Sequence, residues 1–173
     1  MKIVLIGYMG SGKSSIGEKL ATVLGFPFSD LDSEIEKQEG CSASEIFSKK
    51  GEIYFRKIEN EVLKNTLSQT GNMVLATGGG TPCYADSMLF MTEQEEVVAV
   101  YLKTPLDVLC KRLFKEKSNR PLIAHLKSKE ELNDFIRKHL FERAFYYNKA
   151  QVIIENGTEN IDDTIEKIIL KLF

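Results

Sequence analysis

The sequence feature that most constrains the fold is the octapeptide Gly-Tyr-Met-Gly-Ser-Gly-Lys-Ser at residues 7–14. It fits the pattern G-x-x-x-x-G-K-[ST], follows a short apolar run and opens a helical pattern at residues 14–24. This order of strand, loop and helix is typical of a P-loop, in which backbone N–H groups and the helix N-terminus bind phosphate oxygens. The alternative, a glycine-rich turn that binds nothing, is disfavoured because all eight positions fit in the right context.

The last residues of the octapeptide predict a nucleoside triphosphate and a metal ion as ligands. Lys13 can place a positive charge against the β and γ phosphates, and the Ser14 hydroxyl can ligate Mg²⁺. A P-loop enzyme also needs an acidic residue at a strand end to hold the magnesium shell. The strand predicted at residues 73–77 ends in three glycines, so this acid must come from elsewhere.

Asp30 and Asp32 follow a weaker strand pattern and are the candidates for that acid. Open α/β sheets bind their ligands at the carboxyl ends of the strands. In an extended segment residues i and i+2 point the same way, so both carboxylates can face the phosphate site. The alternative is that Asp32 or Ser33 caps the following helix, and capping and function can coexist.

Short apolar runs alternate with longer helical patterns along the chain, which is typical of a parallel sheet covered by helices on both faces. The predicted strands lie at residues 2–6, 26–29, 73–77, 97–102 and 151–154. No repeat or linker separates them, so we expect a single domain over residues 1–173. The predicted fold class is α/β, a three-layer P-loop fold with a five-stranded parallel sheet flanked by helices.

Several residues predict where helices begin. Ser42 and Ser128 each have a glutamate three residues later, which is the spacing of a capping box. Thr104 is predicted to cap a helix that Pro105 opens. A last helix is expected from about residue 161 to 173, with one apolar face.

Charge and cysteine content exclude several classes of protein. The 23 Lys and Arg residues nearly balance the 25 Asp and Glu residues, so with a net charge of −2 we expect no nucleic-acid partner. The apolar N-terminal run is too short for a membrane span or a secretory signal. Three widely spaced cysteines without a zinc motif fit a reducing, cytoplasmic compartment. No coiled-coil pattern or long exposed apolar strand is apparent, so we expect a monomer.

Three further features indicate what accepts the phosphoryl group. The glycine triplet at residues 78–80 suits backbone lying against a ligand, and a tight turn is the alternative. Arg56 can be held by Glu59 on a helix to bind a carboxylate, and a surface ion pair is the alternative. Residues 114–127 are polar and aperiodic, so we expect a mobile loop, a candidate lid that carries Arg120 over the phosphates.

In chain order these features resemble the shikimate kinase family, and the resemblance covers nearly the whole chain. The P-loop alone indicates only a superfamily, whereas the glycine triplet combined with D-x-D and F-R-x-x-E is more specific. The matching motifs are residues 7–15, Asp30-x-Asp32, Phe55-Arg56-x-x-Glu59, residues 78–80, Arg120-Pro121-Leu122 and the helical Arg143. The resemblance implies a nucleoside-monophosphate-kinase-like P-loop kinase fold, with a substrate-binding region near residues 31–60 and a closing lid near residues 112–127.

The resemblance also implies transfer of the γ-phosphate of ATP to the 3-hydroxyl of shikimate, with Mg²⁺ as cofactor. The implied catalytic residues are Lys13, Asp32 and Arg120, with Asp32 helping to take the proton from the hydroxyl. The implied ATP-binding residues are Gly10, Ser11, Gly12, Lys13, Ser14, Ser15 and Arg120. Ser14 would ligate the metal, and Asp30 would reach it through water. The implied shikimate-binding residues are Asp32, Arg56, Gly79, Gly80 and Arg143, of which the two arginines clamp the carboxylate.

Three other functions stay open on the residues themselves. A gluconate kinase also needs a carboxylate clamp, and only the glycine triplet and F-R-x-x-E argue against it. A nucleoside-monophosphate kinase would normally need more lid arginines than Arg120. A nucleotide-dependent regulatory module would leave Asp32, Arg56 and Arg143 without a role.

Some residues stay unassigned. Arg112 is a candidate for the adenine-stacking arginine of the family, but a lid of variable length makes its spacing to Arg120 ambiguous. No adenine contact is identified at residues 154–157. His125 and His139 have no metal partners and are interpreted as structural or solvated residues.

Overall fold

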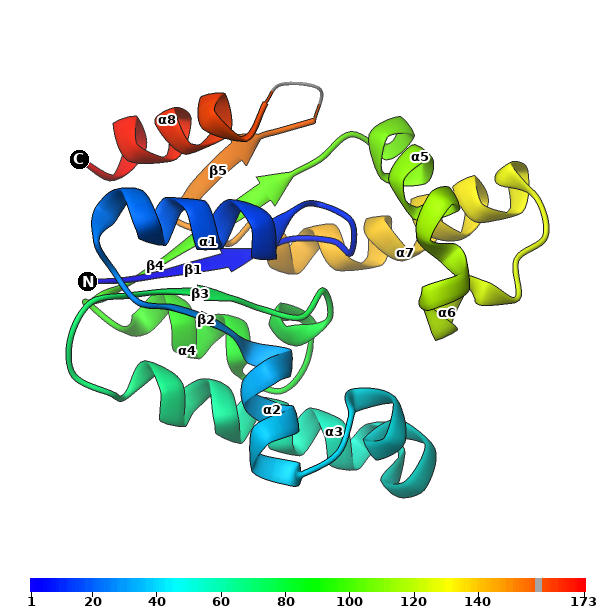
Figure 1. Cartoon of the computed structure of the whole chain (residues 1–173), viewed down its shortest axis with the longest axis horizontal. Helices are drawn as coiled ribbons and strands as arrows, with labels where there is room; N and C mark the ends of the chain where they lie inside the picture. Colours follow the sequence, from blue (N-terminus) through cyan, green and yellow to red (C-terminus); the bar gives the residue numbers. More distant parts are fainter. Residues whose placement is uncertain (158–159) are drawn as a thin grey trace.

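Parallel strands form one sheet in the computed structural model, which describes residues 1–157 and 160–173. The order across the sheet is β2-β3-β1-β4-β5, and every neighbouring pair is parallel (Figure 1). The strands are β1 (Lys2–Ile6), β2 (Phe28–Asp30), β3 (Met73–Ala76), β4 (Val97–Lys103) and β5 (Val152–Glu155). The predicted α/β fold with a five-stranded parallel sheet is confirmed. The predicted strand ends differ from the observed ends by at most two residues, and most at β2, beside Pro27.

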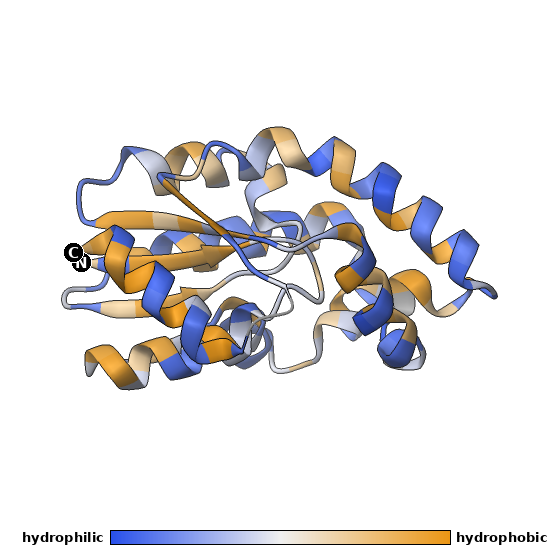
Figure 2. Ribbon diagram, turned by 90° about the horizontal axis from the view of Figure 1, so that it is seen from above, coloured by the Kyte–Doolittle hydropathy of each residue, from blue (hydrophilic) through white to orange (hydrophobic). Residues whose placement is uncertain are grey.

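The sheet is buried on both faces because successive side chains of a strand point to opposite sides. Ile3 and Leu5 pack with α1 (Lys13–Leu24) and α8 (Ile161–Leu172) on one face. The alternate residues of β1 pack with helices on the other face, namely α2 (Leu31–Glu39), α3 (Ala43–Leu67), α4 (Ser87–Glu93), α5 (Leu106–Glu116) and α7 (Lys129–Tyr147). Figure 2 shows the result, with strands that are hydrophobic and helices that carry mixed stripes. No helix within the described ranges has the length and apolar character needed to cross a bilayer.

The helix starts agree with the sequence in part. The Ser42 capping box is present, and the Ser128 hydroxyl accepts from the backbone of Glu131. The prediction for Thr104 and Pro105 is wrong by one residue, because α5 begins at Leu106. The Thr104 hydroxyl instead donates to Asn156 Oδ1 at 2.6 Å, where it joins β4 to the end of β5.

Residues 114–127 are not the aperiodic loop that their composition predicts. The segment begins inside α5 and continues through the short helices η2 (Lys117–Asn119) and α6 (Pro121–Ala124). Ile123 is completely buried in the core, and its amide bonds to the Arg120 carbonyl at 3.1 Å. Single helical turns are too short to produce a hydrophobic period, and Ile123 alone does not make one. The sequence pattern therefore does not predict these two helices.

Two local features of the backbone involve glycine. Gly51, at φ 82° and ψ 170°, interrupts α3, which sequence analysis did not predict. The 3₁₀-helix η1 (Thr81–Cys83) follows the glycine triplet after β3. The P-loop, the triplet and Asn156 follow β1, β3 and β5, and the D-x-D pair begins at the last residue of β2. The parallel topology therefore gathers them at one edge of the sheet.

Candidate active site

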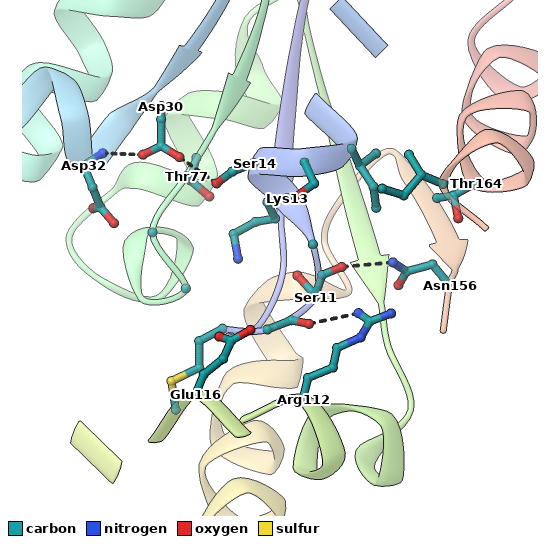
Figure 3. Close-up of a pocket in the computed structure, with 18 of the residues that line it drawn as sticks. Ser11, Lys13, Ser14, Asp30, Asp32, Thr77, Arg112, Glu116, Asn156 and Thr164 are labelled. Atoms are coloured by element: carbon teal, nitrogen blue, oxygen red, sulfur yellow. Dashed lines mark hydrogen bonds between the residues drawn. The ribbon is translucent and has the colours of Figure 1, made fainter. Parts of the chain in front are cut away.

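A cavity of about 470 Å³ lies at this edge of the sheet (Figure 3). The P-loop and the start of α1 form one wall, and the D-x-D pair and β3 end form another. The remaining wall comes from α5, the lid segment and the chain after β5. The lining residues are residues 9–16, Asp30, Asp32, Thr77, Gly78, Gly79, Arg112, Glu116, Arg120, Asn156, Gly157, Ile161 and Thr164.

The Lys13 ammonium is held inside the P-loop. It donates to the backbone carbonyls of Gly7 at 2.9 Å and Tyr8 at 3.0 Å. Burial lowers the pKa of Lys13 to about 8, and the nearby Asp32 and Asp30 carboxylates oppose this shift. The lysine is therefore a desolvated cation at a fixed position, which is suited to a dense negative charge.

The first turn of α1 faces the cavity with free donors. Gly12 precedes α1 at φ 91°, a conformation that favours glycine, and no side chain caps the helix. The first N–H groups of a helix lack partners within the helix, so these groups are available to an anion. The Ser11 hydroxyl is also buried without a hydrogen-bond partner in the described part of the chain. These donors match the oxygen atoms of a phosphate chain.

Ser14 and Asp30 form an oxygen pair in the cavity wall. The Ser14 hydroxyl donates to Asp30 Oδ2 at 2.8 Å, and Asp30 Oδ1 accepts the backbone N–H of Asp32. Hydroxyl and carboxylate oxygens are ligands that Mg²⁺ prefers, and it usually keeps several waters and substrate phosphates as further ligands. The described residues contain no cluster of three or more His, Cys, Asp or Glu that would enclose a metal. The pair therefore fits a magnesium ion that is held mainly by a nucleotide.

Asp32 lies in the first turn of α2, which corrects the prediction of an extended D-x-D segment. The residue that caps α2 is Asp30, so the alternative of a cap at Asp32 or Ser33 is also wrong. Both carboxylates nevertheless line the cavity (Figure 3). Burial raises the pKa of Asp32 to about 6, with smaller contributions from Asp30 and Glu59 and an opposing one from Lys13. A carboxylate with a raised pKa is a stronger proton acceptor than an ordinary one.

Arg56 is fixed mainly by a buried carboxylate, and it also makes a longer ion pair, at 3.5 Å, with the exposed Glu52. Its Nη1 lies 2.7 Å from Glu59 Oε2, and the Glu59 side chain is only 3% exposed. The other oxygen of Glu59 accepts the Thr81 hydroxyl at 2.6 Å. The guanidinium also lies 4.0 Å from the centre of the Tyr84 ring. The contacts leave the guanidinium little freedom, which suits recognition of a planar anion.

The glycine triplet separates Arg56 from the cavity. A Cβ at Gly80 would lie 2.7 Å from Arg56 Nη2, so only glycine allows the guanidinium this position. Arg143, on α7, also lies beside the triplet, since a Cβ at Gly79 would be 3.4 Å from its Nη1 and 3.2 Å from the backbone nitrogen of Met9 in the P-loop. Arg56, Gly80 and Arg143 thus form a second group next to the cavity, while Gly79 belongs to both.

Arg120 lines the cavity from the lid segment. Its Nη2 pairs with Glu116 at 2.7 Å, and both side chains lie at the cavity wall. Sequence analysis placed Arg120 in the lid but gave no role to Glu116. The ion pair joins residues four apart across the end of α5, a spacing that identifies the partner only once the helix is known.

Two cavity residues escaped assignment from the sequence. Arg112 donates to the carbonyls of Gly10 at 3.0 Å and Gly157 at 2.8 Å. Asn156 donates to the Ser11 carbonyl at 3.0 Å. These contacts join positions more than 40 residues apart, so no local pattern signals them.

Tyr8 connects the P-loop to α7. Its hydroxyl lies 2.9 Å from His139 Nδ1, and its ring is completely buried. Burial lowers the pKa of His139, and the Arg143 guanidinium lowers it further.

The three cysteines are free thiols.

The sequence and structure are similar to those of characterised proteins over nearly their whole length. Residues 9–173 match the family model described as shikimate kinase. A shikimate kinase of Flavobacterium johnsoniae is 48% identical over 168 residues, covering 97% of this chain and 96% of the relative.

Two solved structures match the fold closely. Shikimate kinase from Bacteroides thetaiotaomicron superposes with a TM-score of 0.89 at 35% identity, covering 99% of this chain and 98% of that one. Shikimate kinase from Acinetobacter baumannii in complex with shikimate gives a TM-score of 0.86 at 35% identity, covering 99% and 92%.

Proposed function

The chain belongs to the shikimate kinase family, and from this premise we propose how its own residues carry out the reaction. It is an ATP-dependent phosphotransferase that transfers the γ-phosphate of ATP to the 3-hydroxyl of shikimate, a step of aromatic amino acid biosynthesis. The observation that carries the assignment of roles is the buried Arg56–Glu59 pair, separated by the glycine triplet from a cavity that holds Lys13 and Asp32.

The P-loop binds the phosphates of ATP in this proposal. Residues 10–15 present the backbone donors of the loop and of α1, Lys13 neutralises the β and γ phosphates, and Arg120 contacts them from the lid. Ser14 would ligate Mg²⁺, and Asp30 would hold it through water. When bound, Mg²⁺ neutralises phosphate charge that develops during transfer. Arg112 and Asn156 shape the far end of the cavity through their contacts with the P-loop carbonyls.

Asp32 acts on the acceptor hydroxyl. The pKa of its carboxylate is raised to about 6. It is therefore ionised near neutral pH and is a stronger general base than an ordinary carboxylate. As the 3-hydroxyl oxygen bonds to the γ-phosphorus and the bond to the β-phosphate oxygen breaks, the hydroxyl proton passes to Asp32. Lys13 lies close enough to lower the pKa of Asp32, so the base and the phosphate-binding cation are neighbours.

Arg56 and Arg143 bind the shikimate carboxylate, with the Gly79 and Gly80 backbone beside the ring. Both guanidinium groups lie beside the triplet, and neither residue lines the P-loop cavity, which supports binding of the acid group next to the triplet rather than at the transferred phosphate. A guanidinium offers two parallel N–H groups that match the two oxygens of a carboxylate.

The test of the activity is ADP release from Mg²⁺–ATP with shikimate, gluconate, a nucleoside monophosphate or no acceptor. We expect turnover with shikimate alone. Preferred turnover of gluconate or of a nucleotide would identify a different kinase, and equal hydrolysis without any acceptor would indicate a regulatory nucleotide-binding module.

Replacing Arg56 by alanine should weaken shikimate binding by about thirtyfold or more, because loss of one partner of a desolvated charge pair costs about 2–5 kcal/mol. Arg56→Lys should restore only part of the affinity, since lysine lacks the planar pair of donors. The affinity for ATP should barely change in either variant. Calorimetric titration with shikimate and with ATP measures both.

The control for this prediction is an analogue of shikimate in which a neutral amide replaces the carboxylate. It should bind poorly to the unmodified enzyme, and the Arg56→Ala penalty should shrink for it. If the amide binds as well as shikimate, or if Arg56→Ala weakens ATP and shikimate equally, the role of Arg56 is structural.

The lid near residues 112–127 closes over bound substrates in this proposal. Its helices η2 and α6 are each only about one turn long, and Arg120 reaches the cavity from between them. Amide exchange in residues 117–127 should be fast in the free protein and slow with ADP and shikimate bound. Equal protection in both states would mean that the segment is a static part of the fold.

The remaining features fit a single enzyme domain over residues 1–173, with a substrate-binding region near residues 31–60. We propose that it acts as a monomer on the small molecules ATP and shikimate, without nucleic acid or membrane partners. Its three free thiols support a cytoplasmic location.

A further inference from the structure

Tyr147, near the end of α7, makes a buried contact with the glycine triplet. Its ring is completely buried, and its hydroxyl donates to the Gly79 carbonyl at 2.5 Å. The two residues are 68 positions apart, so the bond joins α7 to the loop after β3. The phenol oxygen of a buried tyrosine usually has a hydrogen-bond partner, and for Tyr147 the partner is the backbone of the proposed acceptor site.

Arg143 belongs to the same group of contacts. It lies four residues before Tyr147, one helical turn away on the same face of α7. Burial raises the pKa of the Tyr147 hydroxyl, and the positive charge of the Arg143 guanidinium opposes this rise. The same guanidinium lies beside Gly79. The Tyr147 hydroxyl and an arginine of the proposed carboxylate clamp therefore both adjoin the same glycine of the triplet.

The planarity of the peptide bond gives this contact a consequence. The Gly79 carbonyl and the Gly80 N–H belong to one trans peptide unit and point in opposite directions. A carbonyl fixed toward Tyr147 thus turns the Gly80 N–H away from α7. Among the described residues this N–H has no hydrogen-bond acceptor, and neither has the N–H of Gly79.

We propose that Tyr147 is a positioning residue for the acceptor, which orients the Gly79–Gly80 peptide so that its N–H can donate to shikimate. The inference rests on the proposed function, because it takes the triplet backbone as part of the shikimate site. In this proposal Tyr147 touches neither substrate and acts only through the Gly79–Gly80 backbone. Glycine makes such support necessary, since a triplet without side chains has many accessible backbone conformations.

Tyr147→Phe tests the proposal, with Tyr101→Phe as the matched control. Tyr101 is also buried, its ring centre lies 5.0 Å from that of Tyr147, and its hydroxyl has no hydrogen-bond partner in the described part of the chain. Loss of one hydrogen bond that orients the acceptor should raise the KM for shikimate about five- to tenfold in Tyr147→Phe. The kcat, the KM for ATP and the melting temperature should stay close to those of the unmodified enzyme. Tyr101→Phe should leave all four unchanged.

Two results would overturn the proposal. One is an unchanged KM for shikimate in Tyr147→Phe, and the other is a parallel rise of both KM values with a lower melting temperature, which indicates a purely structural tyrosine. The proposed carboxylate site is tested separately by Arg56→Ala. If that variant does not lose shikimate affinity selectively, the carboxylate site is contradicted, whatever the result for Tyr147.

A measurement on the unmodified enzyme applies even if Tyr147→Phe does not fold. With ¹⁵N-labelled glycine, the Gly80 amide resonance should move and its exchange should slow when shikimate binds without nucleotide. An amide that does not respond to shikimate contradicts the proposed orientation.

Discussion

Replacing Lys13 by alanine should lower kcat by about a hundredfold to a thousandfold, which is the usual effect of removing one group that stabilises developing charge. The ammonium is buried within the P-loop, and in the proposed function it faces the triphosphate. The effect should therefore be the same for any acceptor that the enzyme still uses. Steady-state ADP release at saturating ATP and shikimate measures it.

Lys19→Ala is the matched control, because Lys19 lies on the same helix in an exposed ion pair with Asp162. Exposed ion pairs contribute little, so its kcat and melting temperature should stay nearly unchanged. The loop carbonyls that Lys13 bonds also lose a donor in Lys13→Ala, so a folding check by circular dichroism belongs with the assay. A Lys13→Ala enzyme that keeps more than a tenth of the original kcat would contradict the role.

Asp32→Asn should reduce phosphoryl transfer to shikimate by about a hundredfold to ten-thousandfold, the usual contribution of a general base. Asparagine keeps the shape of the side chain and removes the charge that accepts the proton. ATP binding should survive, because the groups proposed to contact ATP are unchanged. The two variants thus fail at different steps, which single-turnover transfer and ATP titration separate.

The control for Asp32→Asn is Glu34→Gln in the same first turn of α2. Glu34 accepts hydrogen bonds from Ser29 and Lys37 and is not part of the cavity lining. Its replacement reports the cost of losing an acidic residue at this helix start without touching the reaction. Near-normal turnover in Asp32→Asn would show that the proton leaves by another route.

The fold was largely predictable because its signals are local. A buried parallel strand is a continuous apolar run, and the P-loop motif predicts the strand before it and the helix after it. Prediction was weakest where a local signal was short, at the three residues of β2 and in the single-turn helices of the lid. The kink at Gly51 could not be predicted, because an isolated glycine inside a helical pattern is compatible with an unbroken helix.

The candidate site was predictable where one motif carries one role, and not where distant segments cooperate. Lys13, Asp30 and Arg56 are visible because each has its partner or its motif within a few residues. Arg112 and Asn156 bond to P-loop carbonyls 102 and 145 residues away, and only the folded chain brings them together. The contact of Tyr147 with the glycine triplet belongs to the same class.

The contact between Tyr8 and His139 gives the protein a built-in spectroscopic reporter. The chain has only two histidines and no tryptophan, so its imidazole NMR spectrum contains two ring systems that are simple to assign. His125 ends the short helix α6 in the lid segment, while His139 bonds to the P-loop tyrosine and lies one turn from Arg143. One-dimensional spectra of an unmodified sample can therefore follow the lid and the acceptor helix as separate signals, through every stage of a substrate titration.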